Sequence, residues 1–109
     1  MAARLRVQWT ENALTDLLEI IRFIARDSPQ NAWKVHKRIR ARAMTLTSLP
    51  DRGHVVPELA ELAVVGYREL SIPPYRIVYR IEKKSVFVLA VLDGRRDIRR
   101  ILSERLLRL

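Results

Sequence analysis

Apolar and polar residues alternate near the start of the chain and then recur at helical intervals. Alternation over Arg4–Trp9 is typical of a half-buried β-strand. Thr10 follows, a residue type whose side chain accepts hydrogen bonds from the free amides of a first helical turn. Beyond it, apolar residues recur every three or four positions, at Ala13, Leu14, Leu17, Leu18, Ile21, Ile24 and Ala25. This pattern predicts a strand followed by an amphipathic helix that begins after Thr10.

A second helix is predicted after the sequence Asp27-Ser28-Pro29. Pro is tolerated in the first turn of a helix, and Ser or Asp can cap the free amides there. The apolar stripe of this helix is Ala32, Val35, Ile39, Ala43, Leu46 and Leu49. Basic side chains cover much of its remaining surface, namely Lys34, Lys37, Arg38, Arg40 and Arg42. We expect the two helices to form a hairpin.

Three more strands are predicted over Tyr67–Ile72, Tyr75–Lys83 and Val86–Leu92. Their connections, Pro73-Pro74 and Lys83-Lys84-Ser85, are short enough for antiparallel hairpins. The last strand is apolar on both faces, which is typical of a central strand. These segments therefore predict a mostly antiparallel meander.

The segments on either side of the meander are expected to be a loop and a short helix. The connection after Pro50 contains Gly53 and Pro57, and the ambiguous stretch Ala60–Val65 is also assigned to loop. A basic amphipathic helix, with Asp97 as its cap, is indicated by Ile98, Ile101, Leu102, Leu106 and Leu109. We predict one α+β domain over residues 1–109, with an N-terminal strand, a two-helix hairpin, a three-stranded antiparallel meander and a short C-terminal helix.

The middle strand of the meander carries a candidate anion-binding face. Alternate residues of a strand share a face, so Ile77, Tyr79 and Ile81 lie on one side. Arg76, Val78 and Arg80 lie on the other side, pointing away from the presumed helix layer. Arginine suits bidentate contacts with phosphate or carboxylate groups. This face is therefore the candidate site, although solvation of Arg80 and pairing of Arg68 or Arg76 with Glu69 or Glu82 would be ordinary structural alternatives.

Charge narrows the class of partner. The chain has 21 basic and 12 acidic residues and a formal charge of +9, which favours a polyanionic partner, either nucleic acid or an acidic protein, over a membrane surface. Cysteine is absent, and His36 and His54 show no metal-ligand spacing, so we expect no metal and no cofactor. No apolar run suggests a signal peptide or a membrane span, and we expect a cytoplasmic location.

A series of short motifs runs along nearly the whole chain. They are Trp9-Thr10 with Ala13, Asp16 and Leu17; Ile24-Ala25 with Asp27-Ser28-Pro29; Leu49-Pro50 with Gly53 and Val56-Pro57-Glu58; Tyr67-Arg68-Glu69-Leu70; Tyr75-Arg76-Ile77-Val78-Tyr79-Arg80; and Gly94-Arg95-Arg96-Asp97. In this order and spacing they resemble the RelE/ParE superfamily, the toxins of bacterial type II toxin-antitoxin (plasmid stabilisation) systems. The order of elements in that family is also similar to the order predicted here.

The resemblance implies one of two activities. ParE-like members inhibit DNA gyrase and are not nucleases, whereas RelE-like members are metal-independent endoribonucleases that cut mRNA on the ribosome. In a RelE-like protein, basic side chains on the sheet stabilise the transition state while the RNA 2′-hydroxyl attacks. The residues that match this pattern, and would be catalytic in an mRNA interferase, are Arg68, Arg76 and Arg96.

Three departures from the nuclease pattern favour the ParE-like reading. Leu70 stands where a second Lys is expected, Leu102 falls near the position of a Tyr, and Asp93 replaces a His before the Gly-Arg-Arg segment. Acid-base chemistry then lacks an obvious agent. We predict a ParE-like gyrase inhibitor; the alternatives are a RelE-like mRNA interferase and, from another class, a non-toxic basic nucleic-acid-binding module.

The implied partner is a cognate antitoxin with a flexible, often acidic segment that wraps the toxin. Such segments combine a helix in a groove near the helical hairpin with backbone contacts at the sheet. We expect Ile20, Phe23 and Trp33 to be partly exposed and to bind the antitoxin in a higher-order complex. The target implied by the resemblance is DNA gyrase or ribosome-bound mRNA.

Overall fold

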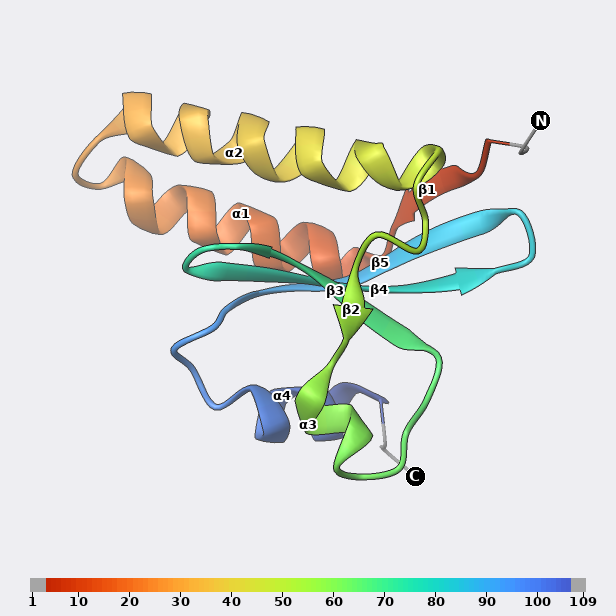
Figure 1. The fold of residues 1–109 in the computed structure, drawn as a ribbon. Helices are drawn as coiled ribbons and strands as arrows, with labels where there is room; N and C mark the ends of the chain where they lie inside the picture. The colour runs from red at the N-terminus through yellow and green to blue at the C-terminus, as the bar shows by residue number, and fades with distance from the viewer. Residues whose placement is uncertain (1–3, 107–109) are drawn as a thin grey trace.

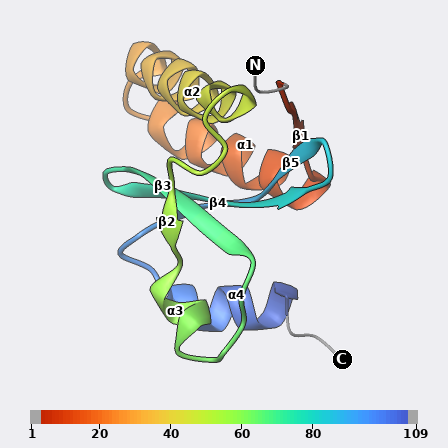
Figure 2. The ribbon, with the colours of Figure 1, turned by 45° about the vertical axis from the view of Figure 1, so that its right-hand side comes forward.

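A computed structural model describes residues 4–106 of the chain as a mixed five-stranded sheet with helices on both faces (Figure 1). The elements are β1 (Arg6–Trp9), α1 (Glu11–Ala25), α2 (Pro29–Met44), the 3-10 turn η1 (Thr45–Thr47), β2 (His54–Val55), α3 (Pro57–Ala60), β3 (Tyr67–Ile72), β4 (Tyr75–Glu82), β5 (Ser85–Asp93) and α4 (Ile98–Leu106). The hairpin of α1 and α2 covers one face of the sheet, and α3 and α4 lie on the other (Figures 1 and 2).

The strand order is β1-β5-β4-β3-β2, which confirms the predicted meander and adds a strand at each edge. β3, β4 and β5 pair antiparallel, and β1 pairs parallel to β5. The central position predicted for β5 is therefore confirmed. The predicted strand bounds differ slightly from the observed ones, since β1 begins at Arg6 rather than Arg4 and β4 ends at Glu82 rather than Lys83.

Helix α1 begins where the sequence predicts. Thr10 Oγ1 accepts a hydrogen bond from the amide of Ala13 at 3.2 Å and donates one to the carbonyl of Val88 at 3.0 Å, so the cap also fixes the helix to β5. The predicted apolar stripe is too wide, however. Leu14 and Leu18 are 42% and 47% exposed. They line a surface hollow between α1 and α2 and do not pack against the sheet.

Helix α2 also has its predicted start. Ser28 Oγ accepts a hydrogen bond from the amide of Asn31 at 3.1 Å, and Ala32, Ile39 and Ala43 are buried. The prediction was wrong for Leu49, which is 55% exposed. The α-helix ends at Met44 and is followed by the 3-10 turn, so the 3.6-residue period of the helix no longer applies at Leu49.

The sequence suggested that the face of the sheet carrying Arg76 is open, but the structure shows that it is covered. It is covered by α3 and α4, whose apolar residues pack with the sheet in a second core of Val56, Leu59, Val78, Ala90, Leu92, Ile98, Ile101 and Leu102. The loop expected over Ala60–Val65 begins with the last residue of α3 and includes Val64, which packs against this core. β2 and α3 escaped prediction because each is too short to show a period.

The cap predicted for α4 is confirmed. Asp97 Oδ1 accepts a hydrogen bond from the amide of Arg100 at 3.2 Å, and Ile98, Ile101 and Leu102 face the second core. Leu109, the last residue of the predicted stripe, lies outside the described residues. Within residues 4–106, no helix combines the length and the apolar character needed to cross a membrane.

Asp16 joins the two helical layers at the edge of β5. β1 accompanies β5 only as far as Val88, and beyond that point the amide of Val91 donates a hydrogen bond to Asp16 Oδ2 at 3.0 Å. Arg105 of α4 donates two further hydrogen bonds to the same carboxylate, at 2.7 and 2.6 Å. These hydrogen bonds to Asp16 raise the pKa of the Arg105 guanidinium. A buried carboxylate on α1 therefore holds both a strand edge and the C-terminal helix.

Replacing Asp16 by Ala should lower the free energy of unfolding by about 3 kcal/mol, the lower end of the range for breaking a buried ion pair, since Arg105 keeps some contact with solvent. Urea unfolding followed by circular dichroism measures this. The matched control is Thr15→Ala at an exposed position of the same helix, which should change stability by less than about 0.5 kcal/mol. Equal stability of the two variants would contradict the assignment.

Candidate functional site

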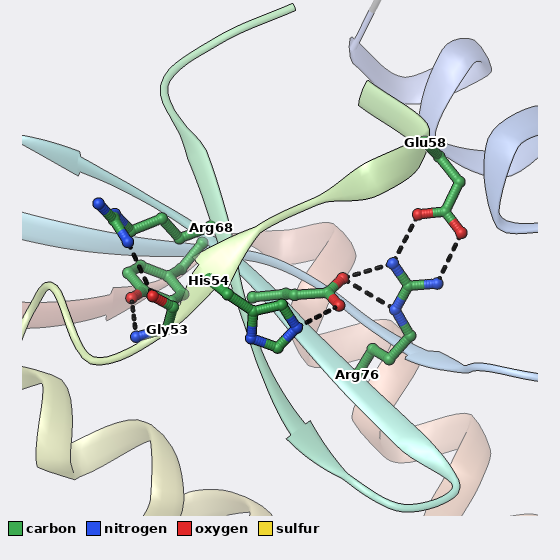
Figure 3. A network of polar contacts seen from close by, with 7 residues as sticks. Gly53, His54, Glu58, Arg68 and Arg76 are labelled. Carbon is green, nitrogen blue, oxygen red and sulfur yellow. Dashed lines mark hydrogen bonds and ion pairs between the residues drawn. The ribbon is translucent and has the colours of Figure 1, made fainter. Parts of the chain in front are cut away.

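Arg76 lies at the centre of a partly buried network of charges between the sheet and α3 (Figure 3). Its guanidinium donates to Glu69 Oε1 at 2.8 and 2.5 Å and to the two carboxylate oxygens of Glu58 at 2.8 and 2.6 Å. Glu69 comes from the neighbouring strand, and Glu58 comes from the first turn of α3. The Arg76 side chain is only 15% exposed. Its donors are therefore used within the fold.

The electrostatics of this network favour the charged forms. The hydrogen bonds from Arg76 hold the pKa of the Glu58 carboxyl below its usual value, and those to Glu58 raise the pKa of Arg76. His54 of β2 lies at the rim, with Nε2 at 3.1 Å from Glu69 Oε2 and its side chain 63% exposed. The sequence suggested Glu69 as a partner of Arg76. It gave no sign of Glu58, which lies 18 residues away in an element that was not predicted.

Arg68 lies on the opposite face of the sheet from Arg76. It shares its face of β3 with the buried Leu70 and Ile72, and its guanidinium donates to the carbonyl of Gly53 at 2.7 Å. Figure 3 shows Arg68 and Arg76 reaching to different sides of β2. The structure thus uses Arg68 to hold the loop before β2.

Tyr79 fixes the same loop from within the core. Its hydroxyl donates to the carbonyl of Pro50 at 2.7 Å and accepts a hydrogen bond from the amide of Gly53 at 3.0 Å. A Cβ at Gly53 would stand 2.5 Å from that hydroxyl oxygen and 2.6 Å from the carbonyl of Glu69. A side chain at this position would therefore displace the loop, which accounts for the glycine.

Arg95 and Arg96 follow β5 in an exposed turn. Arg95 donates to both carboxylate oxygens of Asp93, at 2.9 and 2.6 Å, and these hydrogen bonds lower the pKa of Asp93 to about 2. Arg96 is exposed and lines a groove of about 280 Å³ between α1 and the end of β5. Since Arg68 and Arg76 lie on opposite faces of the sheet, the structure does not bring all three of Arg68, Arg76 and Arg96 together.

The remaining positions singled out in the sequence are distributed as follows. Leu70 and Leu102 are core residues, 3% and 1% exposed. Arg80 pairs with Glu82 at 2.7 Å and lies over the ring of Tyr67 at 5.9 Å from its centroid. Among the described residues, no group of three or more carboxylate and imidazole side chains is arranged to hold a metal ion.

The three residues expected to meet an antitoxin are divided between two surfaces. Phe23 is 69% exposed and, with the partly buried Ile20, lines the same groove as Arg96. Trp33 is 58% exposed on α2, with its ring 5.5 Å from that of His36. A second hollow of about 310 Å³ lies between the helices, lined by Leu14, Leu17, Leu18, Ile21, His36 and Arg40. The exposure of Leu14 and Leu18, which the sequence did not suggest, makes this surface more apolar than expected.

Comparisons with known proteins assign this fold to a family, the toxins of the RelE/ParE superfamily. Residues 7–98 match the family described as the ParE toxin of the type II toxin-antitoxin system parDE, and the chain belongs to that family. It is 33% identical over 92 residues to Toxin RelE2 of Caulobacter vibrioides, an alignment that covers 84% of this chain and 97% of the relative. It also resembles a chain from the chromosomal ParDE system of P. aeruginosa, with a TM-score of 0.67 and 22% identity, over 83% of this chain and 96% of that one.

Acid should weaken the fold through Glu58. The pKa of Glu58 is lowered in the folded state, so at acid pH the unfolded state binds more protons. The resulting stabilisation is complete above pH 4.5, the usual pKa, and is lost as the pH falls below that value. Between about pH 5 and about pH 3, stability should fall more steeply in the natural chain than in Glu58→Gln. Urea midpoints across this range measure the difference. Asn12→Ala, an exposed control that removes no titratable group, should keep the natural slope. If Glu58→Gln keeps it too, the ion pair between Glu58 and Arg76 does not contribute to stability.

Proposed function

We propose that this toxin is a ParE-like inhibitor of DNA gyrase, acting in the cytoplasm and neutralised by a cognate antitoxin. The observation that carries the proposal is the state of Arg76. A metal-independent ribonuclease needs cations aimed at the place where negative charge develops in the transition state. Here the guanidinium instead meets two carboxylates at 2.5 to 2.8 Å. Its field at any bound phosphate is offset by these two negative charges.

The positions of the other arginines support the same conclusion. Arg68 is bonded to a loop carbonyl on the opposite face of the sheet, and Arg96 lies in the turn after β5. Because Arg68 and Arg76 lie on opposite faces of the sheet, one phosphate cannot contact both of them. Leu70 and Leu102, which stand where a nuclease has polar residues, are part of the core. We infer that this chain acts by binding its target rather than by cutting RNA.

One observation favours the mRNA interferase as a second candidate. Two groups capable of proton transfer are present at the site: Glu58 belongs to the Arg76 network, and His54 lies at its rim. A general base works best when its pKa lies near the working pH. The pKa of Glu58 is shifted in the other direction, which makes it a weaker base. The gyrase proposal therefore has the stronger support.

Exposed apolar side chains on the hairpin fit a protein partner. Phe23 and Trp33 are large apolar residues that the fold leaves in solvent, and aromatic anchors of this kind carry much of the affinity at protein interfaces. The net charge of +9 would draw in an acidic segment. We propose that the antitoxin covers the groove at Ile20 and Phe23 and the surface around Trp33.

Inducible expression of the chain in bacteria tests the function. We expect growth arrest with gyrase-linked DNA breaks, while mRNA on ribosomes stays uncut. Cuts placed at fixed codon positions, with DNA intact, would contradict the gyrase proposal and support the interferase.

Co-expression tests the antitoxin surface in the same cells. The antitoxin encoded beside the toxin should restore growth with the natural chain but fail with Phe23→Ser/Trp33→Ser, which should remain toxic. A matched control is Val65→Ser, a change at an apolar residue that is 86% exposed elsewhere on the molecule. Full rescue of the double variant would place the antitoxin on another surface.

A further inference from the structure

Helix α2 carries an excess of positive charge that the fold does not balance. Its 16 residues include five lysines and arginines, at Lys34, Lys37, Arg38, Arg40 and Arg42, and no Asp or Glu. None of the five forms an ion pair with a described residue, whereas Arg76, Arg95, Arg99, Arg100 and Arg105 each contact at least one carboxylate. The charge of α2 is therefore available to an outside partner.

The two sides of α2 differ in chemistry. Lys34, Arg38 and Arg42 are spaced four residues apart, so they form a row along one side of the helix. The other side presents aromatic contacts, with Lys37 at 5.7 Å from the centroid of the Trp33 ring and Arg40 at 5.2 Å from that of Trp9. The cationic row thus contains no aromatic contact, and the aromatic contacts lie on the neighbouring row of the helix.

A hollow beside this row provides a place for an anion. It has a volume of about 410 Å³ and lies between α2 and the end of β3, lined by Arg38, Ala41, Arg42, Thr45, Ser71, Ile72 and Pro73. No acidic residue is among these lining residues. Arg42 Nε is enclosed and has no hydrogen-bond acceptor among the described residues. Two guanidinium groups therefore border a hollow with donor capacity that the protein itself does not use.

We propose that the row of Lys34, Arg38 and Arg42 binds the phosphate backbone of a nucleic acid, with one phosphate held in the hollow between Arg38 and Arg42. Contacts to phosphate need cations and donors but no apolar anchor, and guanidinium groups suit them especially well. An acidic protein segment would need such anchors to bind tightly, and none of the three row residues is apolar. The composition of the row therefore favours nucleic acid.

This inference goes beyond gyrase inhibition and does not depend on it. The toxin would contact nucleic acid directly, without sequence preference, through a helix face distinct from the groove at Phe23. Near a target that itself holds DNA, such a contact would add affinity by linking two binding events.

The test is binding of the 109-residue chain to a short fluorescent duplex of arbitrary sequence, followed by anisotropy across a salt series. The variant is Lys34→Gln/Arg38→Gln, because both residues are exposed and the change should leave the fold intact. The control is Lys83→Gln/Lys84→Gln, which removes the same charge from an exposed turn. Adding Arg42→Gln to the first variant probes the hollow, and circular dichroism checks each fold.

We expect Lys34→Gln/Arg38→Gln to bind the duplex roughly tenfold more weakly than the natural chain. The slope of log K against log salt should become shallower by about 1.8, because two phosphate contacts are lost. The control should keep the natural slope. Equal losses in both variants would show that only net charge matters and would overturn the proposal. So would unchanged DNA binding by the α2 variant together with loss of binding to polyglutamate, which would identify an acidic protein as the partner.

Discussion

Arg76 makes four hydrogen bonds to Glu58 and Glu69, and the two to Glu58 connect α3 to the sheet. The attachment of α3 depends on this pairing. α3 has only one turn, too short to be stable alone, yet Leu59 on it is 1% exposed and packs in the second core. Removing three charges from water is costly unless each is satisfied by its partners. Here the geometry provides those partners, so the charges both fix α3 and stay buried.

Asp16 attaches a helix to the sheet at a second place, as the pair of Arg76 and Glu58 does for α3. It satisfies a strand amide that β1 leaves free and pairs with Arg105, so α4 is anchored to the hairpin layer as well as to the second core. Both networks pair arginine with carboxylate inside the fold. The arginines and lysines of α2 are different, because they lie on a helix without acidic residues. Arg76 and Arg105 therefore stabilise the fold, whereas the basic side chains of α2 are available to bind a partner.

Much of the first layer could be predicted from sequence, because long periodic segments carry a strong signal. The caps Thr10 and Ser28 and the meander of β3, β4 and β5 are where the pattern places them. The widths of the apolar stripes were overestimated, since Leu14 and Leu18 obey the helical period but meet solvent. Periodicity gives the direction of a side chain, and what covers it depends on the neighbouring element.

The candidate site could be predicted only in part. The sequence singled out the arginines, but the ion pairing of Arg76 depends on Glu58, which lies on an element with too few residues to show a pattern. The opposite orientations of Arg68 and Arg76 follow from strand alternation once the pairing of β3 with β4 is known. Arg76 is enclosed because α3 and α4 cover this face of the sheet. No pattern in the sequence indicated where these two helices would pack.

The central claim is that the fold itself uses the charge of Arg76. A double-mutant cycle of Arg76→Ala and Glu58→Ala, with unfolding free energies measured in urea, tests it most directly. We expect Arg76→Ala to cost about 3 kcal/mol, because two carboxylates lose their partner, and the cycle to give a coupling energy of about 1 to 3 kcal/mol. An Arg76→Ala protein as stable as the natural chain, with no coupling to Glu58, would contradict the claim and leave the guanidinium free for a substrate.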